Sequence, residues 1–212
     1  MSQAVFESLS EQQQQDLRTV CERLQKQNRS LNLVAPSTVD QMWERHILDS
    51  LQLVPMVEQA LEGLEGPQSV LDIGTGGGLP AIPLAIAFAQ SDNISVQALD
   101  SDRKKVDSIR LTTLGLTCRI TLHSERVGDH RLQHAVVTSR ALASLSKLLD
   151  WTTSVLKPGG KLIFLKGARH AEEVAEAVAE GWRFECQTFP SVTQAEAAVL
   201  VLSDISRNPT HE

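Results

Sequence analysis

Residues 69–85, with the sequence SVLDIGTGGGLPAIPLA, carry the clearest chemical signal of the chain. An apolar run containing one acid, Asp72, leads into four glycines between positions 74 and 78, and a helical apolar pattern follows. This order predicts a strand, a tight turn and a helix. Glycine lets the backbone adopt positive φ and approach a ligand closely, and the free N–H groups of a helix start point toward the same place. We therefore expect a small-molecule site at this turn.

The residues of the turn favour a cationic nucleoside over a dinucleotide. The fingerprint G-x-G-x-x-G/A fits in part, because a register that starts at Gly74 puts Leu79 where the third small residue belongs. Asp72 would repel a pyrophosphate, whereas the sulfonium and ammonium groups of S-adenosylmethionine tolerate a nearby carboxylate. An acid two residues before a G-x-G-x-G turn resembles the first motif of Rossmann-like methyltransferases. An NAD-linked enzyme and a glycine turn without a ligand are the alternatives.

Alternating strand and helix patterns follow the turn. Strands are predicted at 69–73, 94–99, 118–122, 135–138, 161–166, 183–189 and 197–202, and helices at 80–89, 103–114, 144–155 and 170–180. Such alternation implies a parallel sheet covered on both faces. Residues 190–196 are too few for a crossover helix, so the final strand should run antiparallel. The predicted fold is α/β, a Rossmann-like seven-stranded class I methyltransferase sheet.

The segment before this sheet predicts a helical cap. Ser10 and Gln13 form a capping-box pattern, which indicates a long amphipathic helix from about residue 11. A second helix is predicted over 39–53. The Gly-Leu-Glu-Gly-Pro turn at 63–67 is the expected boundary, with the cap at 1–66 and the S-adenosylmethionine-dependent methyltransferase domain at 67–212.

Composition excludes several classes of protein. The formal charge of the 212 residues is -6, which argues against a general nucleic-acid binder. The three cysteines include no C-x-x-C pair, so neither a disulfide framework nor a zinc site is indicated. The first residues lack a signal-peptide pattern, and the longest apolar run, 79–89, is too short to span a bilayer. We expect a cytoplasmic monomer without a metal ion or a membrane contact.

Polar residues at the ends of the predicted strands are candidates for the site, because ligands bind beyond the carboxyl ends of parallel strands. Asp100 ends the second strand, where its carboxylate can accept both ribose hydroxyls of the cofactor; it could also cap the helix that starts near Arg103. Ser124, Glu125 and Arg126 follow the third strand and should lie beside the adenine. In the cap, Arg45 and Asp49 stand four residues apart, a spacing that allows a helix-surface ion pair, and His46 lies between them in the sequence.

Several short segments together resemble the RsmG (GidB) family. They are RHILDS at 45–50, DIGTGGGLPAIPL at 72–84, LDS at 99–101, SRA at 139–141 and LKG at 165–167. The resemblance extends from about residue 31 to 203. The chain departs from the family at 32–34, where Asn-Leu-Val replaces the usual Asn-Leu-Thr, at 76–78, where three glycines replace a frequent Gly-Pro-Gly, and at 124–126, where Ser-Glu-Arg replaces Arg-Ala-Glu.

The resemblance implies methylation of N7 of one guanine in bacterial 16S ribosomal RNA, within the small ribosomal subunit, from S-adenosyl-L-methionine. This nitrogen carries a lone pair and no proton, so its attack needs no general base, and orientation can supply roughly 7–11 kcal/mol of the barrier. A methyltransferase for a small molecule or protein, and a cofactor-binding module without catalysis, are the alternatives.

The resemblance also implies roles for single residues. Gly74, Gly76 and Leu79 shape the turn against the methionine part of the cofactor. Arg140 ends the fourth strand beside the expected transfer point and contacts cofactor or RNA, and Lys166 ends the fifth and holds a phosphate of the target nucleotide. These two are the expected catalytic residues. Arg45 and His46 are expected to contact RNA.

Overall fold

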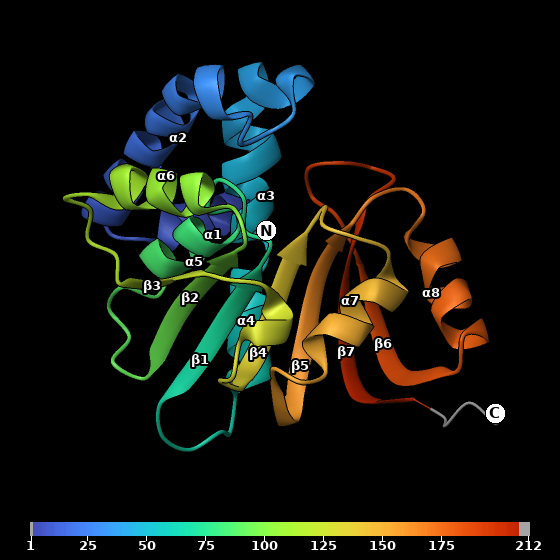
Figure 1. Ribbon diagram of the computed structural model, residues 1–212. Helices are drawn as coiled ribbons and strands as arrows, with labels where there is room; N and C mark the ends of the chain where they lie inside the picture. Colours follow the sequence, from blue (N-terminus) through green and yellow to red (C-terminus); the bar gives the residue numbers. More distant parts are fainter. Residues whose placement is uncertain (1, 208–212) are drawn as a thin grey trace.

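The computed structural model describes residues 2–207, and its centre is one mixed β-sheet (Figure 1). The strands are β1 (Gln68–Ile73), β2 (Ile94–Asp100), β3 (Ile120–Ser124), β4 (His134–Arg140), β5 (Leu156–Lys166), β6 (Trp182–Pro190) and β7 (Ala198–Arg207). Their order is β3-β2-β1-β4-β5-β7-β6. Strand β7 pairs antiparallel with both β5 and β6, while the pairs among β1 to β5 are parallel. The predicted seven-stranded sheet with a reversed last strand is confirmed.

Helices cover both faces of the sheet, and each covered face has its own apolar cluster. Helices α7 (Leu145–Thr152) and α8 (His170–Ala179) pack on one face against Leu71, Val137 and Phe164. The other face is covered by α4 (Val54–Leu61), α5 (Ala81–Ala87) and α6 (Arg103–Thr113) together with the N-terminal helices. Alternate residues of β1 point to opposite faces: Val70 joins the second cluster and Leu71 the first, as the pleat requires.

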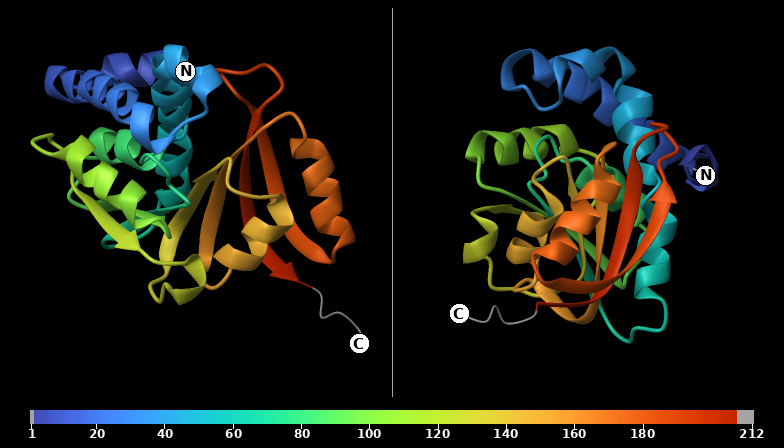
Figure 2. Two further views of the ribbon diagram at one scale, coloured as in Figure 1. Left: turned by 45° about the horizontal axis from the view of Figure 1, so that its top comes forward. Right: turned by 90° about the vertical axis from the view of Figure 1, so that its right-hand side faces the viewer.

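The N-terminal helices comprise α1 (Ser2–Ser8), the long α2 (Glu11–Leu31) and the short α3 (Asp49–Leu51). Helix α2 lies above the carboxyl ends of the strands, and α1 lies lower, where it packs against α3 (Figures 1 and 2). The capping box of Ser10 and Gln13 at the start of α2 is present as predicted. Gln13 also donates from Nε2 to the carbonyl of Ile86 at 2.7 Å, and Asp16 accepts the Thr117 N–H at 2.8 Å, so α2 is tied to α5 and to the loop before β3. One apolar cluster contains residues from both sides of the predicted domain boundary at residues 66 and 67. The boundary itself stays a prediction.

The predicted helix over 39–53 is replaced by three short helical segments. A 3-10 helix (Pro36–Gln41) leads into a π-helix (Trp43–Leu48) and then into α3. A π-helix closes its hydrogen bonds over five residues and is common at functional sites. Here it contains Arg45 and His46.

No helix within residues 2–207 combines the length and the apolar character that a bilayer crossing requires.

Candidate active site

A cavity of about 990 Å³ lies where the N-terminal helices meet the carboxyl ends of β1, β2, β4 and β5. This volume is at the upper end of what small-ligand sites occupy. The lining includes most residues predicted from the sequence: Arg45, His46, Gly74, Gly76, Leu79, Asp100, Glu125, Arg126, Arg140 and Lys166. The structure thus brings together side chains that are up to 121 positions apart, from Arg45 to Lys166.

The glycine turn forms the floor of the cavity beside β1. Gly76 has a φ of +57°, and a Cβ built there would come no closer than 3.8 Å, to the Leu33 carbonyl. Its backbone therefore faces open space on the cavity side. Gly78 has a φ of +87°, and its Cβ would lie 2.5 Å from the Ile82 side chain, so packing of the turn against α5 requires glycine.

Asp100 connects the turn to the start of α6. Its Oδ2 accepts the Gly76 N–H and its Oδ1 accepts the Asp102 N–H, both at 2.9 Å. Asp102, not Asp100, caps α6, because its Oδ1 accepts the Lys104 N–H at 2.9 Å. The helix-capping alternative for Asp100 is therefore wrong. A carboxylate offers about four lone pairs, so Asp100 retains capacity for two ribose hydroxyls.

Asp72 lies beneath the same turn and is fully buried. Burial raises the pKa of its carboxyl to about 7, although the Thr138 hydroxyl donates to Oδ1 at 2.9 Å. A cation bound above the turn would favour the ionised form of this carboxyl. Asp72 below the turn, Asp100 on its rim and the open backbone of Gly76 fit a nucleoside that carries a cationic group, and they fit S-adenosylmethionine better than a diphosphate.

Ser124, which ends β3, and the two residues that follow it divide between solvent and the cavity. Glu125 and Arg126 line the cavity, whereas Ser124 is exposed and is not among the lining residues. Glu125 Oε1 lies 2.7 Å from His130 Nδ1, which fixes the carboxylate. Within the predicted adenine segment, the geometry therefore favours Glu125 and Arg126 over Ser124.

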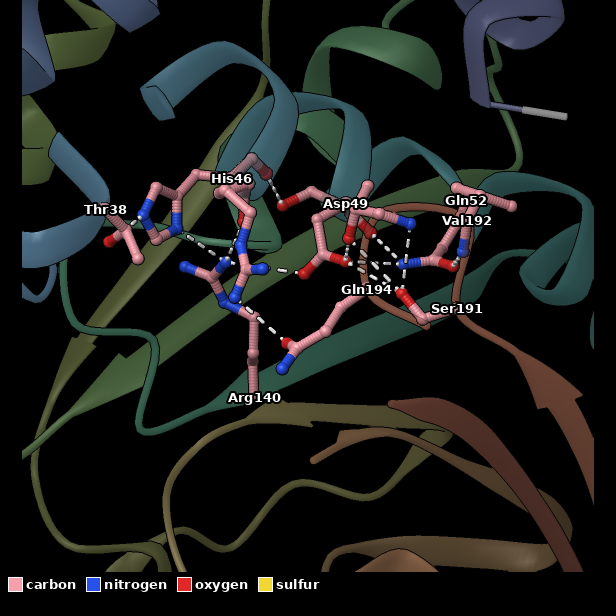
Figure 3. Close-up of polar contacts among 11 residues, drawn as sticks. Thr38, His46, Asp49, Gln52, Arg140, Ser191, Val192 and Gln194 are labelled. Atoms are coloured by element: carbon pink, nitrogen blue, oxygen red, sulfur yellow. Dashed lines mark hydrogen bonds and ion pairs between the residues drawn. The ribbon is translucent and has the colours of Figure 1, made fainter. Parts of the chain in front are cut away.

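Arg140 is the centre of a polar network between β4 and the N-terminal helices (Figure 3). Its Nη1 donates to the Arg45 carbonyl at 3.2 Å and to His46 Nδ1 at 2.8 Å, and it lies 3.6 Å from Asp49 Oδ2. The Arg140 side chain is 17% exposed, so these contacts are largely shielded from water. The hydrogen bonds of Arg140 within residues 2–207 all use Nη1, which leaves Nε and Nη2 available to a ligand.

The contacts of His46 define its protonation state. Because Arg140 can only donate, His46 Nδ1 must accept, and the ring proton resides on Nε2. Nε2–H then donates to Thr38 Oγ1 at 2.8 Å, and the Thr38 hydroxyl donates to the Ala35 carbonyl at 2.9 Å. Burial, together with the charges of Arg140 and Arg45, lowers the pKa of His46 to about 3. His46 is therefore a neutral acceptor that positions Arg140.

Asp49 joins this network to the loop between β6 and β7. Its Oδ1 accepts from Gln52 Nε2 at 2.8 Å and from the Thr193 hydroxyl. The predicted ion pair between Asp49 and Arg45 is absent from residues 2–207; Arg45 donates from Nη2 to Gln194 Oε1 at 3.0 Å instead. Thr38, Thr193 and Gln194 are not predicted from the sequence, because the contacts of the last two span more than 140 residues and no local pattern signals them.

Lys166 lies at the end of β5 and is 8% exposed. Its Nζ is 2.6 Å from Glu173 Oε2 and donates to the Ala143 carbonyl at 2.7 Å. The same Glu173 oxygen accepts the Leu145 N–H at 2.8 Å, so the pair joins the starts of α7 and α8 to β5. One N–H of the ammonium is left for a ligand, and the predicted phosphate contact of Lys166 stays a prediction.

Sequence comparison identifies a family for this chain. The sequence profile of GidB, described as rRNA small subunit methyltransferase G, matches residues 13–198. One relative is the ribosomal RNA small subunit methyltransferase G of Dinoroseobacter shibae, which is 36% identical over 194 residues, 91% of this chain and 96% of that protein.

Solved structures with much lower identity share the fold. The ribosomal protein L11 methylase of Lactobacillus delbrueckii subsp. bulgaricus has a TM-score of 0.55 at 20% identity, covering 77% of this chain and 79% of that one. The S-adenosylmethionine-dependent methyltransferase SibL, in its apo form, has a TM-score of 0.58 at 16% identity, covering 82% and 60%. At such identities the likeness establishes the class I methyltransferase fold and nothing about the substrate.

Proposed function

Because the chain belongs to the GidB family of rRNA small subunit methyltransferase G, we propose that it methylates N7 of one guanine in the 16S rRNA of the small ribosomal subunit. The methyl donor is S-adenosylmethionine. The observation that carries the proposal is a single cavity that joins the glycine turn and Asp100, suited to the donor, to the guanidinium of Arg140 beneath the N-terminal helices. A nucleoside donor and a flipped base can both reach such a cavity.

The cofactor end of the cavity supplies the binding groups. S-adenosylmethionine, when bound, supplies a methyl group on a sulfonium. Asp100 accepts the ribose hydroxyls, and Gly74, Gly76 and Leu79 contact the methionine part. Glu125 or Arg126 meets the adenine. The carboxylate of Asp72 favours the positive charge of the donor from below.

The transfer itself needs orientation and no proton acceptor. The N7 lone pair forms a bond to the methyl carbon while the carbon–sulfur bond breaks, and the electron pair of that bond stays on sulfur. His46 is not a general base in this reaction, since both of its ring nitrogens are engaged and its pKa is about 3. The guanine gains a positive charge, which the carboxylates of Asp49 and Asp100 at the cavity favour electrostatically.

Arg140 orients the target nucleotide. Nη1 is held by His46, Arg45 and Asp49, so the guanidinium has a fixed plane. Its Nε and Nη2 can then donate to an oxygen of the base or of a phosphate, the acceptors that a guanidinium fork matches. This arrangement positions the ring of the guanine and leaves N7 free to react.

Transfer of a labelled methyl group tests the proposal. Small ribosomal subunits from cells that lack the enzyme are incubated with labelled S-adenosylmethionine and the wild-type chain, Arg140→Ala or Arg183→Ala. Arg183 is exposed on β6, away from the cavity lining, and serves as the matched control. We expect label in 16S rRNA with wild type and Arg183→Ala, at a guanine that borohydride and aniline then cleave, and none with a folded Arg140→Ala.

Three results would contradict parts of the proposal. Near-normal transfer by Arg140→Ala would show that the role of this residue is wrong. Label on a protein or a small molecule, with none on rRNA, would favour the alternative substrates. Binding of S-adenosylmethionine without methyl transfer to any fraction of a cell extract would favour a cofactor-binding module without catalysis.

The net charge of -6 bears on the form of the RNA substrate. Few phosphates can be neutralised by an acidic chain, so recognition should depend on the shape of an assembled particle. We expect faster transfer to intact subunits than to short naked RNA containing the same guanine. Equal turnover on both substrates would contradict this expectation.

The proposal extends to a monomer that works in the cytoplasm, where small subunits are assembled. Light scattering in solution should give the mass of a single chain at the concentration used for the transfer assay. A dimer at that concentration would overturn this part of the proposal.

A further inference from the structure

A second polar cluster lies on the sheet face that carries α7 and α8, next to the edge strand β3. It contains His123 and Glu125 at the end of β3, His130 after the 3-10 turn Val127–Asp129, and His134 at the start of β4. Within residues 2–207, one group of three His, Cys, Asp or Glu side chains has all its potential metal-ligand atoms within 4.8 Å of one another. The group consists of His123, Glu125 and His130. The proposed methyl transfer uses none of the histidines.

Hydrogen bonding directs a lone pair of His123 toward Glu125. The Nε2 of His123 lies 2.8 Å from Gln97 Oε1, an amide oxygen that can only accept, so Nε2 carries the ring proton. The unprotonated Nδ1 faces Glu125 Oε1 at 3.8 Å. Two electron-pair donors that face each other without a proton between them are arranged to share a cation.

His130 provides the third donor atom and is held by an outer shell. Its Nδ1 is 2.7 Å from Glu125 Oε1, and its Nε2 is 2.9 Å from His134 Nε2. His134 Nδ1 is in turn 2.9 Å from the Ser69 hydroxyl. With a cation on His130 Nδ1, the ring proton resides on Nε2 and donates to His134, whose Nδ1–H donates to Ser69. Metal-binding histidines in proteins are oriented by such a second hydrogen bond.

We propose that His123 Nδ1, Glu125 and His130 Nδ1 bind a divalent transition-metal ion of the Zn²⁺ class. Two imidazoles and one carboxylate, with a fourth position for water, form a ligand set that zinc uses. Metal–ligand bonds of 2.0–2.2 Å place tetrahedral ligand atoms about 3.3–3.6 Å apart. The distances of 2.7 and 3.8 Å from Glu125 Oε1 to the two histidine nitrogens lie on either side of that range, so small side-chain shifts bring both pairs to it.

Burial and access are also suitable for an ion. The His130 side chain is 2% exposed, while those of His123 and Glu125 are 19% and 36% exposed, so the ion can enter from the solvent side. Glu125 also lines the cofactor cavity, so the ion would fix the rim of that cavity. The metal site itself does not depend on the proposed methyl transfer.

Titration calorimetry with Zn²⁺, on the full chain without a histidine tag and freed of metal by a chelator, tests the site. The variants are His123→Ala and Glu125→Gln, with His170→Ala on α8 as the matched control; all three positions are partly exposed. Unfolding in the presence of chelator checks that each variant folds. We expect one Zn²⁺ per chain in wild type and His170→Ala, and affinity at least about tenfold weaker in the two site variants.

A Co²⁺ spectrum provides an independent measurement of the ligand geometry. We expect the visible absorption of four-coordinate Co²⁺ in wild type and its loss in His123→Ala. All three cysteines remain in that variant, so binding to cysteine would survive the substitution. The proposal is overturned by the absence of saturable binding in wild type, by unchanged affinity in both site variants, or by equal loss in His170→Ala.

Discussion

Protonation of His46 should destabilise the protein in mild acid, because the site requires this residue to be neutral. In the folded state His46 Nδ1 accepts from Arg140, and its pKa is lowered to about 3 by burial, Arg140 and Arg45. In the unfolded chain the pKa returns to about 6.5. Between these values the unfolded state binds one proton more than the folded state, so the free energy of unfolding must fall as pH falls.

The size of the effect follows from these two pKa values. At pH 7.5 His46 is neutral in both states and contributes almost nothing. At pH 5.0 the unfolded state is stabilised by protonation while the folded state is not, and the difference is about 2 kcal/mol. This figure is insensitive to the native value provided that it lies well below 5. His46 is 7% exposed, so solvent screening does little to reduce it.

Urea unfolding at pH 7.5 and 5.0 measures this contribution when wild type is compared with His46→Asn, whose side-chain oxygen can still accept from Arg140. All other titrating groups are common to both proteins and cancel in the comparison. We expect wild type to lose about 2 kcal/mol more than His46→Asn on acidification, and His170→Asn, at a partly exposed histidine, to follow wild type. Equal losses of unfolding free energy in wild type and His46→Asn would refute the assignment of His46 as a neutral, hydrogen-bonded imidazole.

Three further substitutions test separate parts of the site. Asp100→Ala removes the acceptor of the ribose hydroxyls and of the Gly76 N–H, and calorimetry should show roughly 100-fold weaker binding of S-adenosylmethionine; unchanged affinity would place the ribose elsewhere. Gly78→Ala puts a Cβ 2.5 Å from Ile82 at a φ of +87°, so urea unfolding should show that the free energy of unfolding falls by about 1–3 kcal/mol. A variant as stable as wild type would mean that the turn packs less tightly against Ile82 than these distances indicate. Glu173→Gln leaves the buried Lys166 ammonium without its counter-ion, and stability should fall by roughly 2–4 kcal/mol at neutral pH; no change would show that the pair is solvated.

The sequence predicts the sheet well because its signals are local. Gly78 and the apolar run before Asp72 define a strand and a turn over adjacent residues, and β1 begins within one residue of its predicted start. The short link between β6 and β7 required the antiparallel last strand, which the structure contains. Strand β5 starts at Leu156 rather than Lys161, because an apparent loop of lysine, proline and glycines continues the strand.

The sequence predicts which residues belong to the candidate site, but it does not predict which of them contact one another. Asp100 and Arg140 were identified because each ends a predicted strand, and the carboxyl ends of parallel strands converge. The contact between Arg140 and His46 is not predictable from the sequence. His46 lies 94 residues away from Arg140, in a π-helix that apolar spacing cannot distinguish from an α-helix. The histidine cluster was missed for a different reason: His123 and His130 show no recognised metal-ligand spacing, and they converge through the fold of the segment after β3.

The most direct test of the central claim is a crystal structure of this chain with S-adenosylmethionine, or with its demethylated product. We expect the ribose hydroxyls to contact Asp100, the adenine to lie beside Glu125 or Arg126, and the sulfur to face the space in front of Arg140. A ligand whose ribose lies far from Asp100, or a natural ligand whose diphosphate lies across Gly74 to Gly78, would contradict the central claim.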